Sequence, residues 1–333
     1  MSRYFIAGGA GFVGSHIVHA LLAKERDATV TVFDNFSSGR EQHLGPAMRD
    51  TRVQVVRSDI KDLHAVIDAM RGHTHVYHFA SNPDIAKAMS QPDIDFWEGT
   101  YLTQNVLEAM RIAGVPRITY ASGSGVYGDT GILATHEDYA PLLPISTYGA
   151  SKLAGEALIC SYCHMFDLRG LAFRFANVVG PHQTHGVGYD FIRSLRRDPS
   201  HLRILGDGTQ SKSYVHIDDV LDAVACAERR SEKRYEVFNV GTDDFVTVTE
   251  IAYLAMEILG ISRQSVEIVY TGGSRGWRGD VPVVRLDLTR IHSLGWKATR
   301  GSADALRASM QAMLAELDDS DSVSDSDHAS RLA

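Results

Sequence analysis

Tyr148 and Lys152 stand four positions apart at the start of a predicted long helix, and their types suit proton transfer. Side chains at this spacing share one helix face and can converge. A free tyrosine titrates near pH 10, which makes it a poor base at neutral pH. A neighbouring ammonium favours the phenolate, so we expect Lys152 to lower the pKa of Tyr148. The pair predicts a general base with a cationic helper, although the same spacing alone is more often a surface pair.

A second candidate is the stretch ASGSGVYG, residues 121–128, at the end of a predicted buried strand. It offers two hydroxyls, on Ser122 and Ser124, and no carboxylate. A serine-rich strand end of this kind usually places one hydroxyl beside a catalytic tyrosine. Ser122 is equally well interpreted as a strand-end hydroxyl with a structural hydrogen bond.

The segment GGAGFVG (8–14) follows the first predicted strand and opens the first predicted helix. Its G-x-G-x-x-G pattern lets the backbone turn tightly and approach a pyrophosphate, which the helix N-terminus then binds. Asp34 ends the second predicted strand about 20 residues later, where a carboxylate hydrogen-bonds ribose hydroxyls and repels a 2′-phosphate. The sequence therefore predicts NAD(H) rather than NADP(H), with Arg40 as a nearby residue able to receive a phosphate.

Later strand ends supply further candidate contacts for this dinucleotide. Asp59 and Ile60 suit the adenine edge, and the small residues after the fourth strand let the cofactor lie along the strand ends. Ordinary loop packing is the alternative for both places. The predicted cofactor-binding residues are Gly8, Gly11, Phe12, Val13, Gly14, Asp34, Asn35, Ser37, Ser38, Gly39, Asp59, Ile60, Phe79, Ala80, Ser81, Tyr148 and Lys152.

Short β-rich runs alternate with helical periods through the first 180 residues or so. Strands are expected at 3–7, 29–33, 52–57, 74–79, 117–122 and 170–175, and helices near 12–24, 61–71, 95–113 and 148–166. This order predicts an α/β fold with a Rossmann-type doubly wound parallel sheet covered on both faces. A strand at 236–239, after a helix that begins near Asp218, is expected to rejoin the sheet.

The rest of the chain predicts a smaller, interleaved C-terminal substrate lobe. We expect an NAD-binding domain at 1–176 plus about 213–242, and a nucleotide-sugar lobe at about 177–212 plus 243–316. Short helices are expected in the lobe near 188–197, 249–259 and 302–316. The tail 317–333 is acidic and nearly free of apolar residues, so we expect it to be disordered.

Composition excludes several classes of protein. Of the 333 residues, 44% are hydrophobic and 22% are charged, which is typical of a soluble globular chain. No apolar run approaches the roughly 18–20 residues of a membrane helix, and we expect no signal peptide. The net charge of −8 argues against a nucleic-acid partner. Three cysteines predict reduced thiols and a cytoplasmic setting, and Cys160 and Cys163 are interpreted as helix packing.

Taken together, the motifs resemble the extended short-chain dehydrogenase/reductases, and within them the NAD-dependent UDP-sugar 4-epimerases. The likeness spans residues 1 to about 316. The motifs that carry it are GGAGFVG, Asp34-Asn-Phe-Ser-Ser-Gly39, His78-Phe-Ala80, Val126-Tyr-Gly128, Tyr148-x-x-x-Lys152 and Arg174-Phe-Ala-Asn-Val-Val-Gly-Pro181.

The resemblance implies a mechanism. Tyr148 takes the proton of the sugar 4-hydroxyl while C4 passes hydride to tightly bound NAD, and Lys152 holds the nicotinamide ribose. The 4-keto sugar swings over and takes the hydride back on its opposite face, so the cofactor is retained. Related dehydratases and decarboxylases carry carboxylates at the strand end that is Gly123–Gly125 here. Their absence favours oxidation and re-reduction at C4 over elimination or decarboxylation.

The same strand end departs from the epimerase pattern. The family's catalytic serine or threonine lies four residues before the tyrosine of V-Y-G, and that position is Gly123. Side chains alternate along a strand, so neither Ser122 nor Ser124 should point where the missing hydroxyl would, unless the glycines turn the chain. We hypothesise that Ser124 or a water replaces it, with Ser122 as the alternative, and that Tyr148 contacts the sugar directly.

The resemblance also implies contacts to the nucleotide sugar. Lys212 stands where the family usually has arginine, so it keeps the charge but loses the bidentate fork. Arg278 competes with Arg275 for a phosphate contact, and a solvated basic loop is the alternative for both. The predicted substrate-binding residues are Asn177, Lys212, Tyr214, Arg275 and Asp280.

The hexose stays open between glucose/galactose and glucuronate/galacturonate. The chain is most similar to a short actinobacterial and archaeal branch, which includes UDP-glucose 4-epimerases and a UDP-glucuronate 4-epimerase of moenomycin (antibiotic) biosynthesis. A C6 carboxylate would want a basic or multi-donor contact. The available residues are His182, His185, Lys87 and Arg193.

Two alternatives to an epimerase remain. A one-way nucleotide-sugar dehydrogenase or reductase, or a non-catalytic nucleotide-sensing module, could share these motifs. HTHVYH (73–78) fits no standard zinc spacing, so no metal is expected. The family implies a homodimer through the helices near 95–113 and 148–166, although packing against the sheet explains their apolar content equally. Neither nucleic acid nor membrane is an expected partner.

Overall fold

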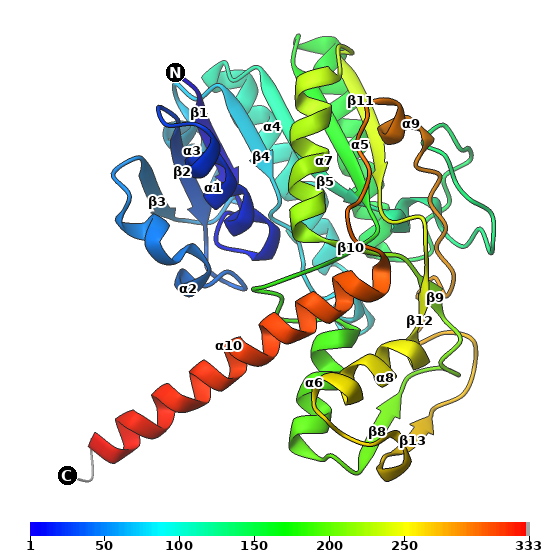
Figure 1. Cartoon of the computed structure of the whole chain (residues 1–333). Coiled ribbons are helices and arrows are strands. Elements are labelled where there is room, and N and C mark those ends of the chain that lie inside the picture. Colours follow the sequence, from blue (N-terminus) through cyan, green and yellow to red (C-terminus); the bar gives the residue numbers. More distant parts are fainter. Residues whose placement is uncertain (331–333) are drawn as a thin grey trace.

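A seven-stranded parallel sheet forms the centre of the computed structural model, which describes the backbone of residues 1–330 and the side chains of residues 1–318. Its strands are β1 (Arg3–Ala7), β2 (Thr29–Asp34), β3 (Val53–Arg57), β4 (His75–His78), β5 (Arg117–Gly123), β6 (Arg169–Phe175) and β11 (Tyr235–Val240). They lie in the order β11-β6-β5-β4-β1-β2-β3 (Figure 1). The predicted Rossmann-type sheet is therefore confirmed, and the late strand does rejoin it beside β6.

Helices cover both faces of this sheet because successive strand side chains point to opposite faces. On β1, Ile6 packs in one core and Phe5 in the other. The first core is closed by α1 (Phe12–Lys24) and α7 (Ile217–Arg230), and the second by α3 (Leu63–Met70), α4 (Tyr101–Ala113) and α5 (Thr147–Met165). Cys160 and Cys163 lie on α5, and Cys163 is fully buried in the second core, as the packing interpretation predicts.

A third core belongs to the smaller lobe beneath the sheet in Figure 1. Its helices are α6 (Val187–Arg197), α8 (Val248–Ile258) and α10 (Ser302–Ser330). The lobe also contains the brief strands expected there, in pairs, although their bounds could not be predicted because runs of two to four residues show no clear period. These pairs are β7 (Asn177–Val179) with β10 (Tyr214–His216), β8 (His201–Ile204) with β13 (Glu267–Tyr270), and β9 (Ser211–Lys212) with β12 (Val246–Thr247).

The C-terminal tail differs from its expected disorder. Helix α10 continues to Ser330 and extends away from the body of the molecule in Figure 1. Leu317 packs against the lobe core and Asp318 pairs with Arg196 at 2.8 Å, so ordered contacts continue past the expected boundary. Residues 331–333 of the predicted tail lie outside the described residues.

The remaining elements are short. They are the helices α2 (Glu41–Leu44) and α9 (Thr289–Ser293), 3₁₀ turns at Gly45–Arg49, Ile85–Met89, Ser124–Tyr127 and Arg263–Ser265, and a π-helical turn at Phe96–Thr100 just before α4. Among the helices of the described chain, none combines the length and apolar character needed to cross a membrane.

Candidate active site

A cleft of about 1000 Å³ lies between the carboxyl edge of the large sheet and the smaller lobe. In open parallel α/β sheets, this edge is where ligands bind. The cleft is lined by every predicted cofactor residue except Gly39, by all four candidate catalytic residues, and by most predicted substrate residues. The catalytic candidates in its wall are Tyr148, Lys152, Ser122 and Ser124, and the substrate candidates are Asn177, Lys212, Tyr214 and Asp280.

The loop between β1 and α1 requires glycine at two positions. A Cβ atom on Gly8, whose φ is +80°, would lie 2.6 Å from the backbone nitrogen of Ala80. A Cβ atom on Gly14 would lie 2.2 Å from the carbonyl oxygen of Gly8. The N-cap of α1, Gly11, makes no side-chain cap, so the first N–H groups of the helix are open to an anion. This cradle fits a dinucleotide pyrophosphate.

Asp34 ends β2 in the wall of the cleft beside this cradle. Its carboxylate accepts hydrogen bonds from the backbone N–H groups of Ala10 at 2.9 Å and Phe36 at 2.8 Å. Burial raises the pKa of Asp34, and these two bonds oppose that shift. Gly39 lies behind this carboxylate rather than in the cleft wall, since a Cβ atom there would lie 3.0 Å from Asp34 Oδ1. Arg40 is exposed and does not line the cleft.

The first turn of α5 places Tyr148 and Lys152 together. The helix begins after Ser146, whose side chain accepts a hydrogen bond from Gly149 N–H at 3.0 Å. Lys152 is 3% exposed, and its Nζ donates to the carbonyl oxygen of Ala121 at 2.8 Å. The same Nζ lies 5.4 Å from the centre of the Tyr148 ring. The expected convergence of the two side chains is present.

The electrostatics of this pair differ from expectation. Burial and, to a smaller extent, the carboxylate of Asp95 raise the pKa of Tyr148 to about 12, against the hydroxyl of Ser81, which lowers it. Burial lowers the pKa of Lys152 to about 8, which Asp95 opposes. The expected fall in the pKa of Tyr148 is not found in the protein alone, because burial and Asp95 outweigh the ammonium of Lys152, which lies over the ring and is bonded to Ala121.

The two candidate serines have different surroundings. Ser122 donates to Glu156 Oε1 at 2.5 Å, and Glu156 forms a buried ion pair with Arg174 at 2.7 Å. Its hydroxyl is therefore held in a structural network, in keeping with the interpretation of Ser122 as a strand-end hydroxyl. Ser124 begins the 3₁₀ turn after β5, and its hydroxyl has no partner among the described residues.

The predicted nucleotide-sugar residues lie at the lobe side of the cleft. Asn177 donates to the carbonyl oxygen of Ser213 at 3.1 Å. Lys212 is paired with Asp280, whose Oδ1 lies 2.7 Å from its Nζ. Tyr214 is 5% exposed, and burial raises its pKa. A cation and a carboxylate are thus presented together, the arrangement that a diphosphate with an attached ribose would need.

Arg275 is the predicted substrate residue that the structure does not bring into the cleft wall. Its guanidinium instead pairs with Asp129 and donates to the carbonyl oxygen of Asp280. Arg278 is exposed and does not line the cleft either. Arg203 of β8 does, and it has no hydrogen-bond or ion-pair partner within residues 1–318. The sequence signal that could have revealed Arg203 is the alternation of side chains along a strand, because Leu202 and Ile204 on either side of it are buried.

The histidines of HTHVYH lie along β4 and just before it. Each hydrogen-bonds a threonine: His73 bonds Thr31, His75 bonds Thr119 and His78 bonds Thr103. No three His, Cys, Asp or Glu residues of the described chain converge as a metal site.

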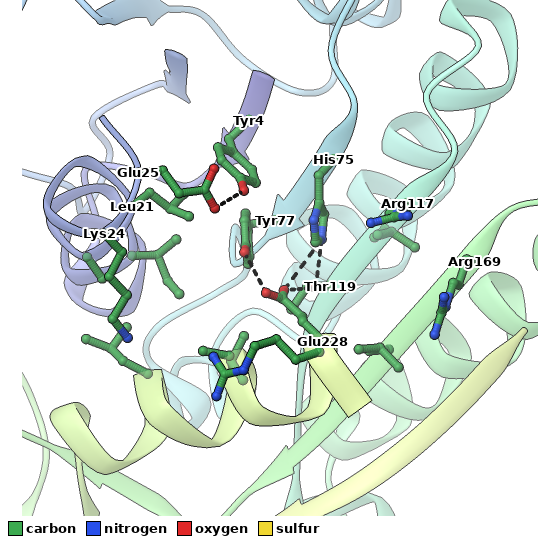
Figure 2. Close-up of a pocket in the computed structure, with 18 residues that line it drawn as sticks. Tyr4, Leu21, Lys24, Glu25, His75, Tyr77, Arg117, Thr119, Arg169 and Glu228 are labelled. Carbon is green, nitrogen blue, oxygen red and sulfur yellow. Dashed lines mark hydrogen bonds and ion pairs between the residues drawn. The ribbon is translucent and has the colours of Figure 1, made fainter. Parts of the chain in front are cut away.

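A second cavity, of about 330 Å³, lies at the opposite, amino-terminal half of the strands between α1 and α7. Figure 2 shows Tyr77, Thr119 and His75 gathered around the carboxylate of Glu228. Tyr77 Oη donates to Glu228 at 3.0 Å and Thr119 Oγ1 donates at 2.7 Å, while His75 Nε2 lies 3.6 Å away. Burial raises the pKa of Glu228 to about 7. None of these side chains was predicted as a site.

Comparison with known proteins matches residues 4–241 to the NAD dependent epimerase/dehydratase family. The chain belongs to this family. It is 31% identical over 317 residues to the UDP-glucose 4-epimerase of Mycolicibacterium smegmatis, covering 93% of this chain and 97% of that protein. A UDP-galactose 4-epimerase structure superposes with a TM-score of 0.84 at 37% identity, covering 95% of this chain and 99% of the other.

The chain is also similar to a solved structure whose bound sugar is acidic. The UDP-glucuronic acid 4-epimerase of Bacillus cereus, in a Tyr→Phe mutant with NAD and a fluorinated UDP-glucuronic acid, superposes with a TM-score of 0.83. It is 26% identical and covers 93% of this chain and 98% of that one. As a member of this epimerase/dehydratase family with NAD-bound structural relatives, the protein is an NAD-dependent enzyme. Neutral and acidic sugars are both represented among its relatives.

Proposed function

We propose that this protein is an NAD-dependent UDP-hexose 4-epimerase. The observation that carries the proposal is the position of Tyr148 and Lys152 between a glycine cradle and the Lys212–Asp280 pair, within one cleft. The strand end beside them, Ala121–Gly125, has no carboxylate. A dehydratase or decarboxylase would need such a group there to move a proton in elimination or decarboxylation.

The residues around the cleft would hold the cofactor in place. The glycine cradle fits the pyrophosphate, Asp34 the adenosine ribose, and Lys152 the nicotinamide ribose. When bound, NAD would supply the hydride acceptor and donor at C4. The cofactor is retained because it is regenerated in each turnover.

Tyr148 is the group that moves the proton. Its phenolate accepts the proton of the sugar 4-hydroxyl as C4 is oxidised, and its phenol returns it when the 4-keto sugar is reduced on the other face. With its pKa at about 12 in the protein alone, Tyr148 needs added positive charge to ionise near neutral pH. Lys152 supplies part of that charge, since a pKa of about 8 keeps it mostly protonated at pH 7. Because Gly123 has no side chain, we infer that Tyr148 contacts the sugar hydroxyl directly.

The hexose is proposed to be neutral at C6. Of the four residues considered for a C6 carboxylate, His185 alone lines the cleft, whereas His182, Lys87 and Arg193 do not. Burial lowers the pKa of His185, so it is uncharged at neutral pH, and the carboxylates of Asp190 and Asp84 lie close enough to act on it electrostatically. A neutral imidazole within the field of two carboxylates is a poor place for a third. This supports UDP-glucose and UDP-galactose over the uronates.

The test uses purified protein without added cofactor. It is incubated separately with UDP-glucose and UDP-glucuronate, and the products are resolved by NMR. We expect UDP-galactose from the first and little or no conversion of the second. Conversion of UDP-glucuronate alone would reverse the hexose assignment. Conversion of neither, or stoichiometric consumption of added NAD(H), would refute the epimerase proposal.

The protein is also proposed to form a homodimer through α4 and α5. Large hydrophobic side chains remain exposed on and beside these helices even though the sheet covers their other faces. They are Phe96, Trp97, Ile112, Met165 and Phe166. Phe96 and Trp97 lie just before α4 and the other three lie at the C-terminal ends of the two helices, so an interface along the helix pair would cover them. Analytical ultracentrifugation should give twice the chain mass.

A further inference from the structure

The end of β5 has no hydroxyl at Gly123, although it has space for one. A Cβ atom built on Gly123 would meet no atom within 4 Å. The neighbouring hydroxyl of Ser122 is committed to Glu156. If a hydroxyl assists Tyr148, it must therefore come from another segment or from Ser124.

Ser81 brings a hydroxyl to the same edge of the sheet from the adjacent strand. β4 and β5 pair in parallel, with His78 opposite Tyr120. Three residues further along each chain come Ser81 and Gly123, and both line the cleft. Ser81 lies close enough to Tyr148 for its hydroxyl to lower the pKa of the phenol, and both side chains line the cleft. Ser81 was expected only to accommodate the cofactor, and the structure adds this contact with the candidate base.

A buried carboxylate ties together the two segments that carry Ser81 and Tyr148. Asp95, which is 1% exposed, precedes the π-helical turn. Its Oδ1 accepts from Asn82 Nδ2 at 2.9 Å and its Oδ2 accepts from Thr147 Oγ1 at 2.7 Å. Asn82 directly follows Ser81, and Thr147 directly precedes Tyr148. One side chain thus fixes the residue next to Ser81 and the residue next to Tyr148.

Stability alone does not explain Asp95. No lysine, arginine or histidine of the described residues forms an ion pair with it, so its direct partners are two neutral donors, and the ammonium of Lys152 acts on it only from a longer distance. A buried carboxylate without a directly paired cation is costly, and an apolar side chain of similar size would avoid that cost. A positioning role gives this carboxylate a reason to be there.

We propose that Ser81, held in place by Asp95, stabilises the phenolate of Tyr148 and so replaces the hydroxyl that Gly123 lacks. The inference rests on the proposed epimerase function. A hydrogen bond to an anionic oxygen is stronger than one to a neutral phenol, so Ser81 favours the state in which Tyr148 acts as a base. Ser81 acts through Tyr148 and is a positioning residue.

The groups that face Tyr148 set the sign of each effect. Asp95 disfavours the phenolate, the hydroxyl of Ser81 favours it, and buried Tyr120 also lies close enough to couple with it. The ammonium of Lys152 lies over the ring, 5.4 Å from its centre. Removing the Ser81 hydroxyl therefore raises the pKa of Tyr148, and removing the Asp95 charge lowers it.

The first test compares three serine variants of the NAD-loaded protein. Ser81→Ala should lower kcat for epimerisation about 10- to 100-fold, the effect of a lost hydrogen bond to a charged group. The ascending limb of its pH–rate profile should move up by about one pH unit. Ser81→Thr keeps the hydroxyl and should recover most of the rate. Ser124→Ala, in the same cleft, should lose less than about threefold. A loss for Ser124→Ala that equals or exceeds the loss for Ser81→Ala would overturn the proposal.

A second measurement needs no turnover. Ultraviolet difference titration against Tyr148→Phe follows the ionisation of Tyr148 itself in the protein as purified. In Ser81→Ala this ionisation should move to higher pH whether or not the protein epimerises a UDP-hexose. A failed epimerase assay and a failed Ser81 inference therefore give different results, because an unchanged titration contradicts the inference whether or not the protein epimerises a UDP-hexose.

The role of Asp95 has its own signature. Asp95→Asn removes the charge, so the ascending limb should move to lower pH, opposite to Ser81→Ala, while kcat falls because the amide cannot accept from both donors as well. Asp93→Asn is the matched control, because Asp93 is exposed two residues earlier. It should change neither the profile nor kcat. If Asp95→Asn behaves like this control, Asp95 has no positioning role.

Discussion

The two cavities of this protein lie at opposite ends of the same strands, and their polar side chains differ in how many partners they have within the protein. In the cleft at the carboxyl edge, Ser124 and Arg203 have no side-chain partner within residues 1–318. In the cavity at the amino-terminal half, Tyr77, Thr119 and His75 contact the single carboxylate of Glu228. Figure 2 shows these side chains turned toward one another rather than presented to the space.

This difference separates a binding site from a structural network. Polar groups that are already satisfied hold the fold together, and a ligand would have to break their bonds. Groups that lie unpaired in a cleft, such as Ser124 and Arg203, can bond a ligand without such a loss, whereas Lys212 and Asp280 would exchange part of their mutual ion pair for bonds to the ligand. The cluster of titratable residues around Glu228 is therefore interpreted as structural, despite the raised pKa of that carboxyl.

The sharpest test of this division is Tyr148→Phe in the cleft. Loss of the general base should lower epimerase kcat by at least about 10³-fold. The free energy of unfolding should change by less than about 1 kcal/mol, because the phenyl ring keeps the packing against Lys152. Coupled kinetic assays and urea denaturation measure the two effects. A stable variant with substantial activity would remove Tyr148 from the mechanism.

Much of the cleft was predictable because its residues are local in sequence. The glycine cradle, Asp34 and the Tyr148–Lys152 pair each lie within one turn or one helix face, so spacing alone places them. The predicted strands agree with the observed ones to within one or two residues for the same reason. Period-two and period-3.6 patterns are readable when an element is long enough to repeat them.

What escaped prediction depends on contacts between distant segments. Arg275 pairs with Asp129, 146 positions away, and Ser81 reaches the sheet edge where Gly123 lies only because β4 pairs with β5. Asp95 is one of several aspartates in its stretch, and only its burial distinguishes it from Asp93. The cavity around Glu228 draws on four strands and two helices, so no local pattern could reveal it.

Glu228→Gln should show that the second cavity governs stability rather than catalysis. The pKa of Glu228 rises from 4.5 to about 7 on folding. Between pH 4.5 and about 7, the native state therefore keeps a proton on Glu228 that the unfolded chain has lost. The resulting stabilisation of the native state is complete below pH 4.5 and disappears as the pH rises through 7. With the side chain 22% exposed, the expected loss across this window is about 2 kcal/mol.

The measurement is urea denaturation between pH 4.5 and 8 for the wild type and the variant. The difference in free energy of unfolding, wild type minus Glu228→Gln, should fall with pH, and kcat at pH 8 should stay near that of the wild type. Glu232→Gln, an exposed residue just beyond α7, is the control and should give a flat difference. A large loss of kcat in Glu228→Gln would join the two cavities functionally and break the comparison.

The smallest expected effect is that of Tyr77→Phe, which removes one hydroxyl from the same network. Tyr77 is 2% exposed, so Glu228 cannot replace the lost hydrogen bond with water on that side, and the free energy of unfolding should fall by about 1 kcal/mol. Because the Tyr77 hydrogen bond favours ionised Glu228, its removal should raise the pKa of Glu228. The fall of the free energy of unfolding with pH should then continue to a higher pH than in the wild type. Tyr4→Phe is the comparison, since its hydroxyl bonds part-exposed Glu25 at 2.6 Å, which water can reach. Equal losses in the two variants, or no shift of the limb in Tyr77→Phe, would show that Glu228 is not the centre of this network.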